Sequence, residues 1–295
     1  MLLEMIKAVF YGILEGITEW LPVSSTGHLI LLDELLSLNV APNLGPVFAA
    51  EYWSMFEVVI QLGAILAVVV MFFGKLNPFS PKKTATEKKG TWVLWGKVCI
   101  ASIPAAAIGI ILDKLIEEAT GKDIDGWLYN WQVVACALIV YGILFIVIER
   151  YHRGKEGEVV SVDDISCRQA MWIGCFQALA IVPGTSRSGS TILGSRLLGI
   201  SRFAAAEFSF FMGIPAMAGA SLIKGVGCLK YVAESGVSVP FAAWAVLLVA
   251  AAVAFGVSMI AIRFLMDFVK RHSFAPFGVY RIVLGVLVIV WFALR

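Results

Sequence analysis

The amino-acid sequence predicts an all-α polytopic membrane protein with an inverted-topology repeat, made of two re-entrant helical hairpins plus about six transmembrane helices. Of its 295 residues, 60% are apolar and only 15% are charged, whereas soluble domains carry about 25% charged residues. Six apolar runs are long enough, or nearly so, to cross a hydrocarbon core of about 30 Å. Two further helical regions are broken at prolines. The net charge of +2 shows no basic excess, so we expect no nucleic-acid partner.

The apolar runs and the broken regions define the elements in order. The first broken region covers about residues 1–35 with its break at Pro22, and the second covers about 168–200 with its break at Pro183-Gly184. Proline removes a helix donor, and a helix broken at membrane depth is tolerated only inside protein or beside a wet cavity. No basic stretch with a cleavage site opens the sequence, so we expect the first helix to be retained. The six predicted spans are 57–73, 92–112, 128–148, 204–223, 241–262 and 276–294.

The charged residues predict the orientation. Lysine and arginine gather in the segments 74–97, 149–168 and 263–281, and such segments lie in the cytoplasm. The segments 32–56 and 113–127 are mainly acidic, with Asp123 and Asp125 in the second, so we place them outside. The first hairpin then enters from the outside and the second from the cytoplasm.

Each hairpin is followed by three spans, and an odd number of spans gives two units of opposite direction. We therefore predict a first repeat at 1–150 and a second, inverted repeat at 151–295, within one membrane domain. Inverted repeats with broken helices place their site near the midplane of the membrane. The residue pairs that support the repeat are Gly12 with Gly174, Ser24 with Ser186, Gly27 with Gly189, Ile30 with Ile192 and Leu31 with Leu193 at an offset of 162 residues, and Gly63 with Gly213 at an offset of 150.

Two carboxylates stand in the first hairpin. Glu15 and Glu19 are four residues apart, so they share one face of a helix, where like charges repel. A divalent cation, Mg²⁺ or Ca²⁺, suits carboxylate oxygens and keeps waters and substrate phosphates as further ligands. We predict that Glu15 and Glu19 hold such an ion. The alternative is a pair of water-facing glutamates near the helix mouth.

A hydroxyl-rich stretch follows Pro22. Ser24, Ser25 and Thr26 are natural N-cap residues, and a helix that begins here points free N–H groups at the loop, which makes an anion site together with Gly27. His28 is suited to act as general base or acid, or as nucleophile. The alternative for His28 is a hydrogen-bonded core residue.

The second loop contains a further set of anion-binding residue types. Glycines such as Gly184 and Gly189 let the backbone approach a ligand, Ser186 and Ser188 donate hydrogen bonds, and Arg187 offers a planar fork for phosphate oxygens. The sequence therefore predicts a phosphate-binding loop. The alternative is a tight polar turn in which Arg187 pairs with a glutamate.

Charge connects the two loops. Glu15, Glu19 and Arg187 sum to −1, and a diphosphate brings roughly −3 because a terminal phosphate titrates near ~6. A metal dication offsets much of this total.

Tyr280 and Arg281 open the last apolar run, and we interpret them as an interfacial anchor.

These residues carry a resemblance to a known family. The stretch from Glu15 to His28 resembles the first motif of the bacterial undecaprenyl-diphosphatase family, also known as the bacitracin-resistance phosphatases. The stretch from Pro183 to Gly189 resembles the second motif. Residues 56–70 and 208–215 are also similar, so the resemblance spans most of the chain. The main departures lie in loops such as the lysine-rich segment 77–97.

The resemblance implies a membrane hydrolase that converts a C55 polyprenyl diphosphate lipid to the monophosphate lipid carrier and inorganic phosphate. It implies carrier recycling for peptidoglycan synthesis, cell shape and bacitracin resistance, in the bacterial plasma (inner) membrane, with the site facing outward. In the family, the residues that match Glu15, Glu19, Ser25, His28 and Arg187 are linked to activity.

We expect the polyprenyl tail in a lateral apolar groove and favour Ser25 as nucleophile with His28 assisting. Two other functions stay open. One is a polyprenyl-phosphate transporter or flippase, since inverted repeats are typical of transporters. The other is a phosphatidic-acid-phosphatase type of enzyme, disfavoured because Ser201-Arg202 lacks a suitably spaced histidine. The sequence leaves open whether Ser25 or His28 attacks, which metal and prenyl chain length are preferred, and whether the protein forms a homodimer.

Overall fold

A computed structural model describes residues 1–121, 126 and 128–294; Asp123 and Asp125 lie outside the described residues. Within these ranges the chain forms helices and loops, with one isolated parallel bridge between Val159 and Ile200, which confirms the predicted all-α class. In chain order the elements are α1 (Leu2–Thr18), α2 (Ser25–Leu36), η1 (Pro42–Leu44), α3 (Gly45–Met71), α4 (Phe73–Leu76), α5 (Ala85–Thr120), α7 (Trp131–Tyr151), η2 (Val162–Asp164), α8 (Cys167–Ala178), η3 (Leu179–Ile181), α9 (Arg187–Leu197), α10 (Arg202–Ser235), α11 (Phe241–Val269) and α12 (Ala275–Ala293).

Six helices in the described part of the chain are long and apolar enough to cross a membrane, namely α3, α5, α7, α10, α11 and α12. They contain or closely match the six predicted spans. Several run further than the apolar stretch because their ends are capped. Thr84 and Glu87 form a capping box at the start of α5, and Gly121 and Gly236 end α5 and α10 in the left-handed conformation.

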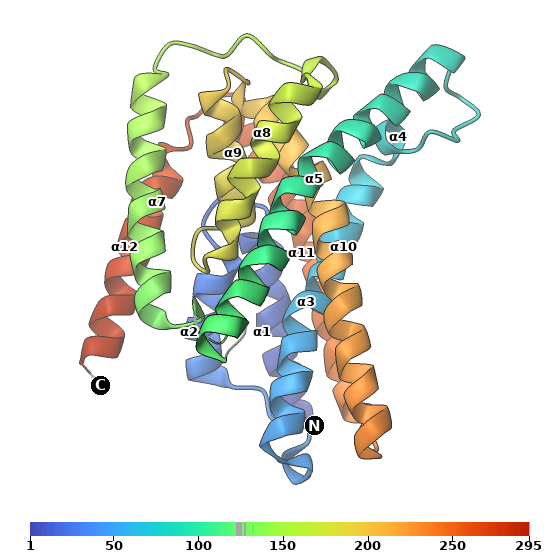
Figure 1. Cartoon of the computed structure of the whole chain (residues 1–295), viewed down its shortest axis with the longest axis vertical. Helices are drawn as coiled ribbons and strands as arrows, with labels where there is room; N and C mark the ends of the chain where they lie inside the picture. The colour runs from blue at the N-terminus through green and yellow to red at the C-terminus, as the bar shows by residue number, and fades with distance from the viewer. Residues whose placement is uncertain (122–125, 127, 295) are drawn as a thin grey trace.

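The two predicted hairpins are present, and each breaks at its proline. The chain turns between α1 and α2 at Pro22, and between α8 and α9 at Pro183-Gly184. The hairpins enter the bundle from opposite ends, so their loops meet inside it (Figure 1). The predicted boundary between the repeats at residue 150 falls at the end of α7 and stays an interpretation of the sequence.

Each hairpin packs against a span from the other half of the chain. Helix α1 lies along α11, and α8 lies along α5. The contacts are close because both hairpins present a glycine: a Cβ at Gly12 would collide with the Ala250 carbonyl of α11, and one at Gly174 would collide with the Ala101 carbonyl of α5. These two glycines are a pair at the predicted offset of 162 residues. The remaining spans pair as α7 with α12 and α3 with α10.

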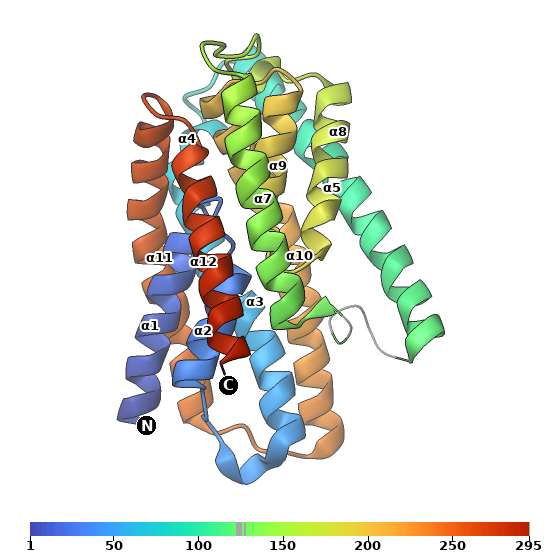
Figure 2. The ribbon, with the colours of Figure 1, turned by 90° about the vertical axis from the view of Figure 1, so that its left-hand side faces the viewer.

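The arrangement is not symmetric at one lateral face. Helix α11 packs along α3, but α5 contacts α10 over a much shorter stretch and leans away from the bundle (Figure 2). Both α5 and α10 contain an internal proline, Pro104 and Pro215 respectively. A proline inside a helix removes a backbone hydrogen bond and favours a bend. A cavity of about 520 Å³ opens between them, lined by side chains that include Ser102 and Ala105 of α5 and Met217 of α10.

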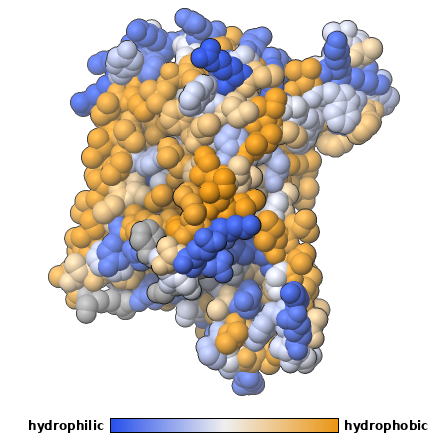
Figure 3. All heavy atoms as spheres, in the orientation of Figure 1, coloured by the Kyte–Doolittle hydropathy of each residue, from blue (hydrophilic) through white to orange (hydrophobic). Residues whose placement is uncertain are grey.

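The distribution of apolar and basic residues indicates how the bundle lies across a membrane. On the face seen in Figure 3, apolar residues form a broad middle zone, and hydrophilic residues gather toward the two ends. The lysine- and arginine-rich connections α3–α5, α7–α8 and α11–α12 all lie at one end, and both termini lie at the other (Figures 1 and 2). Such a separation of basic segments is what the positive-inside rule describes.

Candidate functional site

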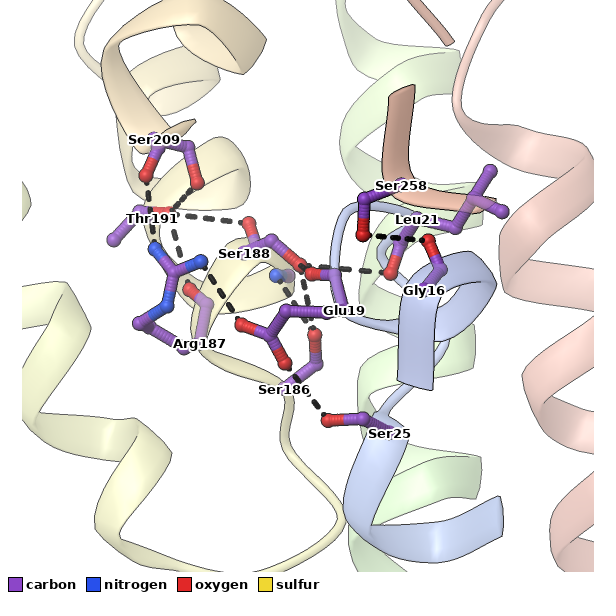
Figure 4. A network of polar contacts seen from close by, with 11 residues as sticks. Gly16, Glu19, Leu21, Ser25, Ser186, Arg187, Ser188, Thr191, Ser209 and Ser258 are labelled. Atoms are coloured by element: carbon purple, nitrogen blue, oxygen red, sulfur yellow. Dashed lines mark hydrogen bonds and ion pairs between the residues drawn. The ribbon is translucent and has the colours of Figure 1, made fainter. Parts of the chain in front are cut away.

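Glu19 joins the two hairpin loops. One carboxylate oxygen, Oε1, accepts a hydrogen bond from Arg187 Nη2 at 3.1 Å, and the other, Oε2, accepts one from Ser25 Oγ at 3.0 Å (Figure 4). Glu19 is 7% exposed, so this ion pair lies largely away from water, where charges interact more strongly. Three residues that the sequence predicts from two distant loops therefore meet at one point.

The guanidinium of Arg187 is fixed from several sides. Its Nη1 donates to the Ser209 carbonyl of α10 at 2.8 Å, and its Cζ lies 6.0 Å from the centre of a Trp20 ring. Gly213 leaves room for this guanidinium, because a Cβ at that position would lie 2.9 Å from Nη2. Arg187 thus pairs with a glutamate, as in the alternative given for the second loop. That glutamate is Glu19 of the other hairpin.

The two helices that leave the loops begin in the same way. Ser24 caps α2 and accepts from the Gly27 N–H at 3.3 Å, and Ser186 caps α9 and accepts from the Gly189 N–H at 3.1 Å. Both serines have positive φ, 73° and 69°, which is uncommon for a residue with a Cβ. The first turns of α2 and α9 therefore start at the two loops, and helix N-termini attract anions.

A cavity of about 120 Å³ lies between these helix starts. It shares Gln61, Arg187 and Met217 with the lateral cavity between α5 and α10. It shares Thr26 and Pro183 with a third cavity of about 390 Å³, which extends to Asp113 and Tyr129. Residues that line the small cavity are Glu19, Ser25, Thr26, Gln61, Ala180, Val182, Pro183, Gly184, Ser186, Arg187 and Met217.

The predicted binding residues fall into two groups. Thr26, Gly184 and Ser186 line the small cavity, as the anion-site prediction requires. The others stabilise the loops: Ser188 Oγ donates to the Glu19 carbonyl at 3.2 Å, and the remaining members make the serine caps. This second group consists of Ser24, Gly27, Ser188 and Gly189.

Glu15 fits a bound cation. It is fully buried, and neither of its carboxylate oxygens has a hydrogen-bond partner among the described residues. A buried carboxylate without a partner is costly, so this group needs either a cation beside it or a proton. The described residues hold no cluster of three or more histidine, cysteine or acidic side chains. A metal ion at Glu15 and Glu19 would therefore take its other ligands from water and substrate oxygens.

His28 has other partners than the sequence suggests. Its Nδ1 lies 2.7 Å from the Ser24 carbonyl oxygen, and its Nε2 lies 2.7 Å from the Tyr280 hydroxyl. Both ring nitrogens are thus engaged, and Glu19, rather than His28, bonds the Ser25 hydroxyl. In the described part of the chain the His28 ring is therefore hydrogen-bonded to Ser24 and Tyr280.

The interpretation of Tyr280 and Arg281 as an interfacial anchor is wrong for Arg281. This side chain is fully buried between the two loops. The reason is tertiary: α12 crosses α7 so closely at Gly278 that the face carrying Gly278 and Arg281 is buried, while Val279 and Tyr280 remain about half exposed.

Sequence reasoning missed several residues that shape the site. Gln61 lines the small cavity, Ser209 accepts from Arg187, and Gly213 makes room for its guanidinium. Gln61 had a signal, because it is a polar residue inside an apolar run. Gly213 also had one, since it pairs with Gly63 at the offset of 150 residues.

Known proteins resemble this chain along nearly its whole length. The family model described as "Bacitracin resistance protein BacA" matches residues 8–287. A protein from Lactiplantibacillus plantarum named undecaprenyl-diphosphatase is 50% identical over 293 residues, 99% of each chain. A protein of the same name from Streptococcus suis is 51% identical over 292 residues, 99% of this chain and 98% of the relative. One from Enterococcus faecalis is 48% identical over 283 residues, 96% of this chain and 95% of the relative.

Proposed function

This chain belongs to the bacitracin-resistance BacA family, and on that basis we propose that it hydrolyses undecaprenyl diphosphate to undecaprenyl phosphate and inorganic phosphate. The observation that carries the proposal is the contact of Glu19 with both Ser25 and Arg187 beside a cavity between two helix N-termini. Two relatives that are 50% and 51% identical to this chain are named undecaprenyl-diphosphatase. The reaction recycles the lipid carrier for peptidoglycan synthesis and confers resistance to bacitracin.

The diphosphate headgroup binds between the loops. The first turns of α2 and α9 direct N–H groups and positive dipole toward this region, and Arg187 adds a guanidinium whose planar fork matches phosphate oxygens. Thr26 and Ser186 line the same cavity with hydroxyls. These groups offset the negative charge that the substrate brings.

Ser25 is the proposed nucleophile and Glu19 the base that assists it. The Ser25 hydroxyl already donates to Glu19 Oε2 at 3.0 Å, which is hydrogen-bond reach for proton transfer. The bond from Oγ to the terminal phosphorus forms as the bridging P–O bond breaks, the proton passes to Glu19, and the lipid monophosphate leaves. Water then attacks the phosphoserine, the bond from Oγ to phosphorus breaks, Glu19 returns the proton to Ser25, and inorganic phosphate leaves. Arg187 and the helix N–H groups stabilise charge on the equatorial oxygens.

A divalent cation, Mg²⁺ or Ca²⁺, is the proposed cofactor. Glu15 and Glu19 would hold it, and the buried, unpartnered oxygens of Glu15 support this assignment. Bound there, the ion would supply positive charge that neutralises the diphosphate. Glu19 keeps its contacts with Ser25 and Arg187 and orients both.

The polyprenyl tail is proposed to leave through the lateral cavity between α5 and α10. That cavity, about 520 Å³, is lined mainly by small apolar side chains and reaches Arg187 at its inner end. A lipid can enter it sideways from the bilayer because α5 leans away from α10 (Figure 2). Only the headgroup then has to reach the polar loops.

The protein is proposed to lie in the bacterial inner membrane with its site facing outward. The three basic connections at one end of the bundle support a cytoplasmic location for that end. The third cavity runs from Thr26 to Asp113 and Tyr129, toward the opposite end. A homodimer stays a prediction from the sequence.

Phosphate release by the purified protein tests the function. With farnesyl diphosphate and Mg²⁺ or Ca²⁺, we expect Glu19→Gln and Arg187→Ala to lower kcat/KM by at least about 10²-fold, as removal of a transition-state donor does. The matched controls are Glu158→Gln, in the connection between α7 and α8, and Arg263→Ala, in α11. Both residues are exposed, and both variants should retain activity. Wild-type turnover in both site variants would refute the proposed site. Vesicles that move intact lipid diphosphate without releasing phosphate would support a transporter instead.

A further inference from the structure

Arg281 of α12 connects the two hairpin loops. Its guanidinium donates to the Pro22 carbonyl of the first loop at 3.2 Å, and to the Gly184 and Thr185 carbonyls of the second loop at 2.7 and 3.0 Å. The side chain is fully buried and has no carboxylate partner among the described residues. All its described hydrogen bonds therefore go to the backbone of the loops.

The neighbouring Tyr280 acts on the first loop through His28. The two rings stack with centres 5.6 Å apart, and the Tyr280 hydroxyl lies 2.7 Å from His28 Nε2. The other nitrogen, Nδ1, faces the Ser24 carbonyl, which can only accept, so Nδ1 carries a proton. In the neutral ring Nε2 is then an acceptor, and the Tyr280 hydroxyl donates to it. The Ser24 carbonyl thus sets the tautomer of His28, while the Tyr280 hydroxyl holds the other side of the ring and keeps it against the backbone of Ser24.

The loops need such restraint because their caps are strained. Ser24 and Ser186 both sit at positive φ, which costs about 1–3 kcal/mol for such a residue and persists only where the surroundings fix it. The carbonyls that Arg281 binds lie two residues before Ser24, and one and two residues before Ser186. Helix α12 therefore holds both loops next to their strained residues.

The helix that pairs with α12 shows that packing does not require this arginine. Helices α7 and α12 meet at Gly142 and Gly278, where a Cβ on either glycine would collide with the carbonyl of the other. Three residues after each glycine stand Phe145 on α7 and Arg281 on α12, and both are fully buried. An apolar side chain satisfies this position in α7, whereas burying a charge costs several kcal/mol. The charge of Arg281 thus has its explanation in the loops.

We propose that Tyr280 and Arg281 are positioning residues for the hydrolysis: Arg281 fixes the two loops relative to each other, and Tyr280 fixes the first loop through His28. Their effect is to bring Ser25 and Glu19, from the first hairpin, against Arg187 of the second. This inference rests on the proposed phosphatase function for its kinetic consequences. Its structural part, the restraint of the loops, can be tested without any turnover.

Hydrogen–deuterium exchange tests the structural part. We expect Arg281→Met to raise exchange in both loops, residues 20–28 and 182–190, and Tyr280→Phe to raise it in the first loop only. The matched control is Arg196→Met, because Arg196 is also buried and donates to loop carbonyls, at Glu156 and Ile200. That variant should loosen residues 155–160 and 200 instead. If both loops exchange as slowly in Arg281→Met as in the wild type, the inference is refuted, whether or not the protein is a phosphatase.

Kinetics tests the functional part. With farnesyl diphosphate we expect Arg281→Met and Arg281→Lys both to lower kcat by about 10²-fold, the effect of a displacement of about 1 Å in a catalytic group, while KM changes by less than about threefold. A raised KM with unchanged kcat would instead mean that Arg281 binds the substrate charge. Tyr280→Phe keeps the ring and should lower kcat and change the pH profile. An unchanged profile would refute the role of Tyr280, and this mild variant also covers the case in which Arg281→Met fails to fold.

Discussion

Gly213 offers a way to move the Arg187 guanidinium without removing any atom of the site. An alanine Cβ at this position would lie 2.9 Å from Nη2 and 3.1 Å from Cζ of Arg187, closer than the ordinary contact range, which begins at 3.4 Å. The guanidinium would have to shift by roughly 0.5–1 Å to reach a normal separation. Its bonds to Glu19 Oε1 and to the Ser209 carbonyl, at 3.1 and 2.8 Å, would then lengthen or break.

The size of the effect follows from these contacts. A hydrogen bond to a charged group contributes about 1.5–3 kcal/mol, and a displacement of about 1 Å at a catalytic group costs about 10²-fold in rate. We therefore expect Gly213→Ala to lower kcat/KM by about 10²-fold, which corresponds to about 2.7 kcal/mol. The helix itself should not suffer, because alanine is a better helix former than glycine by about 0.5–1 kcal/mol.

Phosphate release from farnesyl diphosphate measures this effect, with Gly225→Ala as the matched control. Gly225 lies on the same helix, α10, and a Cβ there would meet nothing within 4 Å. We expect the control to keep wild-type activity and both variants to fold as the wild type does. Wild-type kcat/KM in a well-folded Gly213→Ala protein would refute the position that we assign to the Arg187 guanidinium in catalysis.

Two further predictions concern the cofactor and the tail. Chelation of divalent ions should abolish phosphate release and Mg²⁺ or Ca²⁺ should restore it, with Glu15→Gln needing a higher ion concentration at an unchanged melting temperature; activity in chelator equal to that with metal would contradict the cofactor assignment. Ala105→Phe, in the lateral cavity, should slow hydrolysis of undecaprenyl diphosphate more than that of farnesyl diphosphate. Ala107→Phe, on the exposed side of α5, is its control, and equal slowing of both substrates by Ala105→Phe would contradict the tail route.

Local chemistry predicted the parts of the fold that depend on short stretches of chain. Pro22 and Pro183 mark where the hairpins break, because proline cannot continue a helix. Ser24 and Ser186 begin the following helices, since serine hydroxyls satisfy free N–H groups. These features require no knowledge of what packs against them, so the sequence was sufficient.

Features that depend on helix crossing could not be predicted. Tyr280 and Arg281 stand at the start of an apolar run, where an interfacial anchor and a buried clamp have the same sequence. The structure buries Arg281 and leaves Tyr280 about half exposed, close to the crossing of α7 and α12 at Gly142 and Gly278. His28 was predicted to assist Ser25, but its ring bonds Tyr280, a residue 252 positions away.

Two glycines that the predicted repeat pairs with each other have different neighbours in the structure. Gly63 and Gly213 are a pair in the sequence, yet a Cβ at Gly63 would meet the backbone of Ala251 in α11, whereas one at Gly213 would meet the guanidinium of Arg187. The first glycine therefore serves helix packing, and the second makes room for a site residue. At the lateral face α5, which contains Pro104, contacts α10 over a shorter stretch than α11 contacts α3. This difference leaves room for Arg187 beside α10 and for the cavity between α5 and α10, which is the proposed route of the polyprenyl tail.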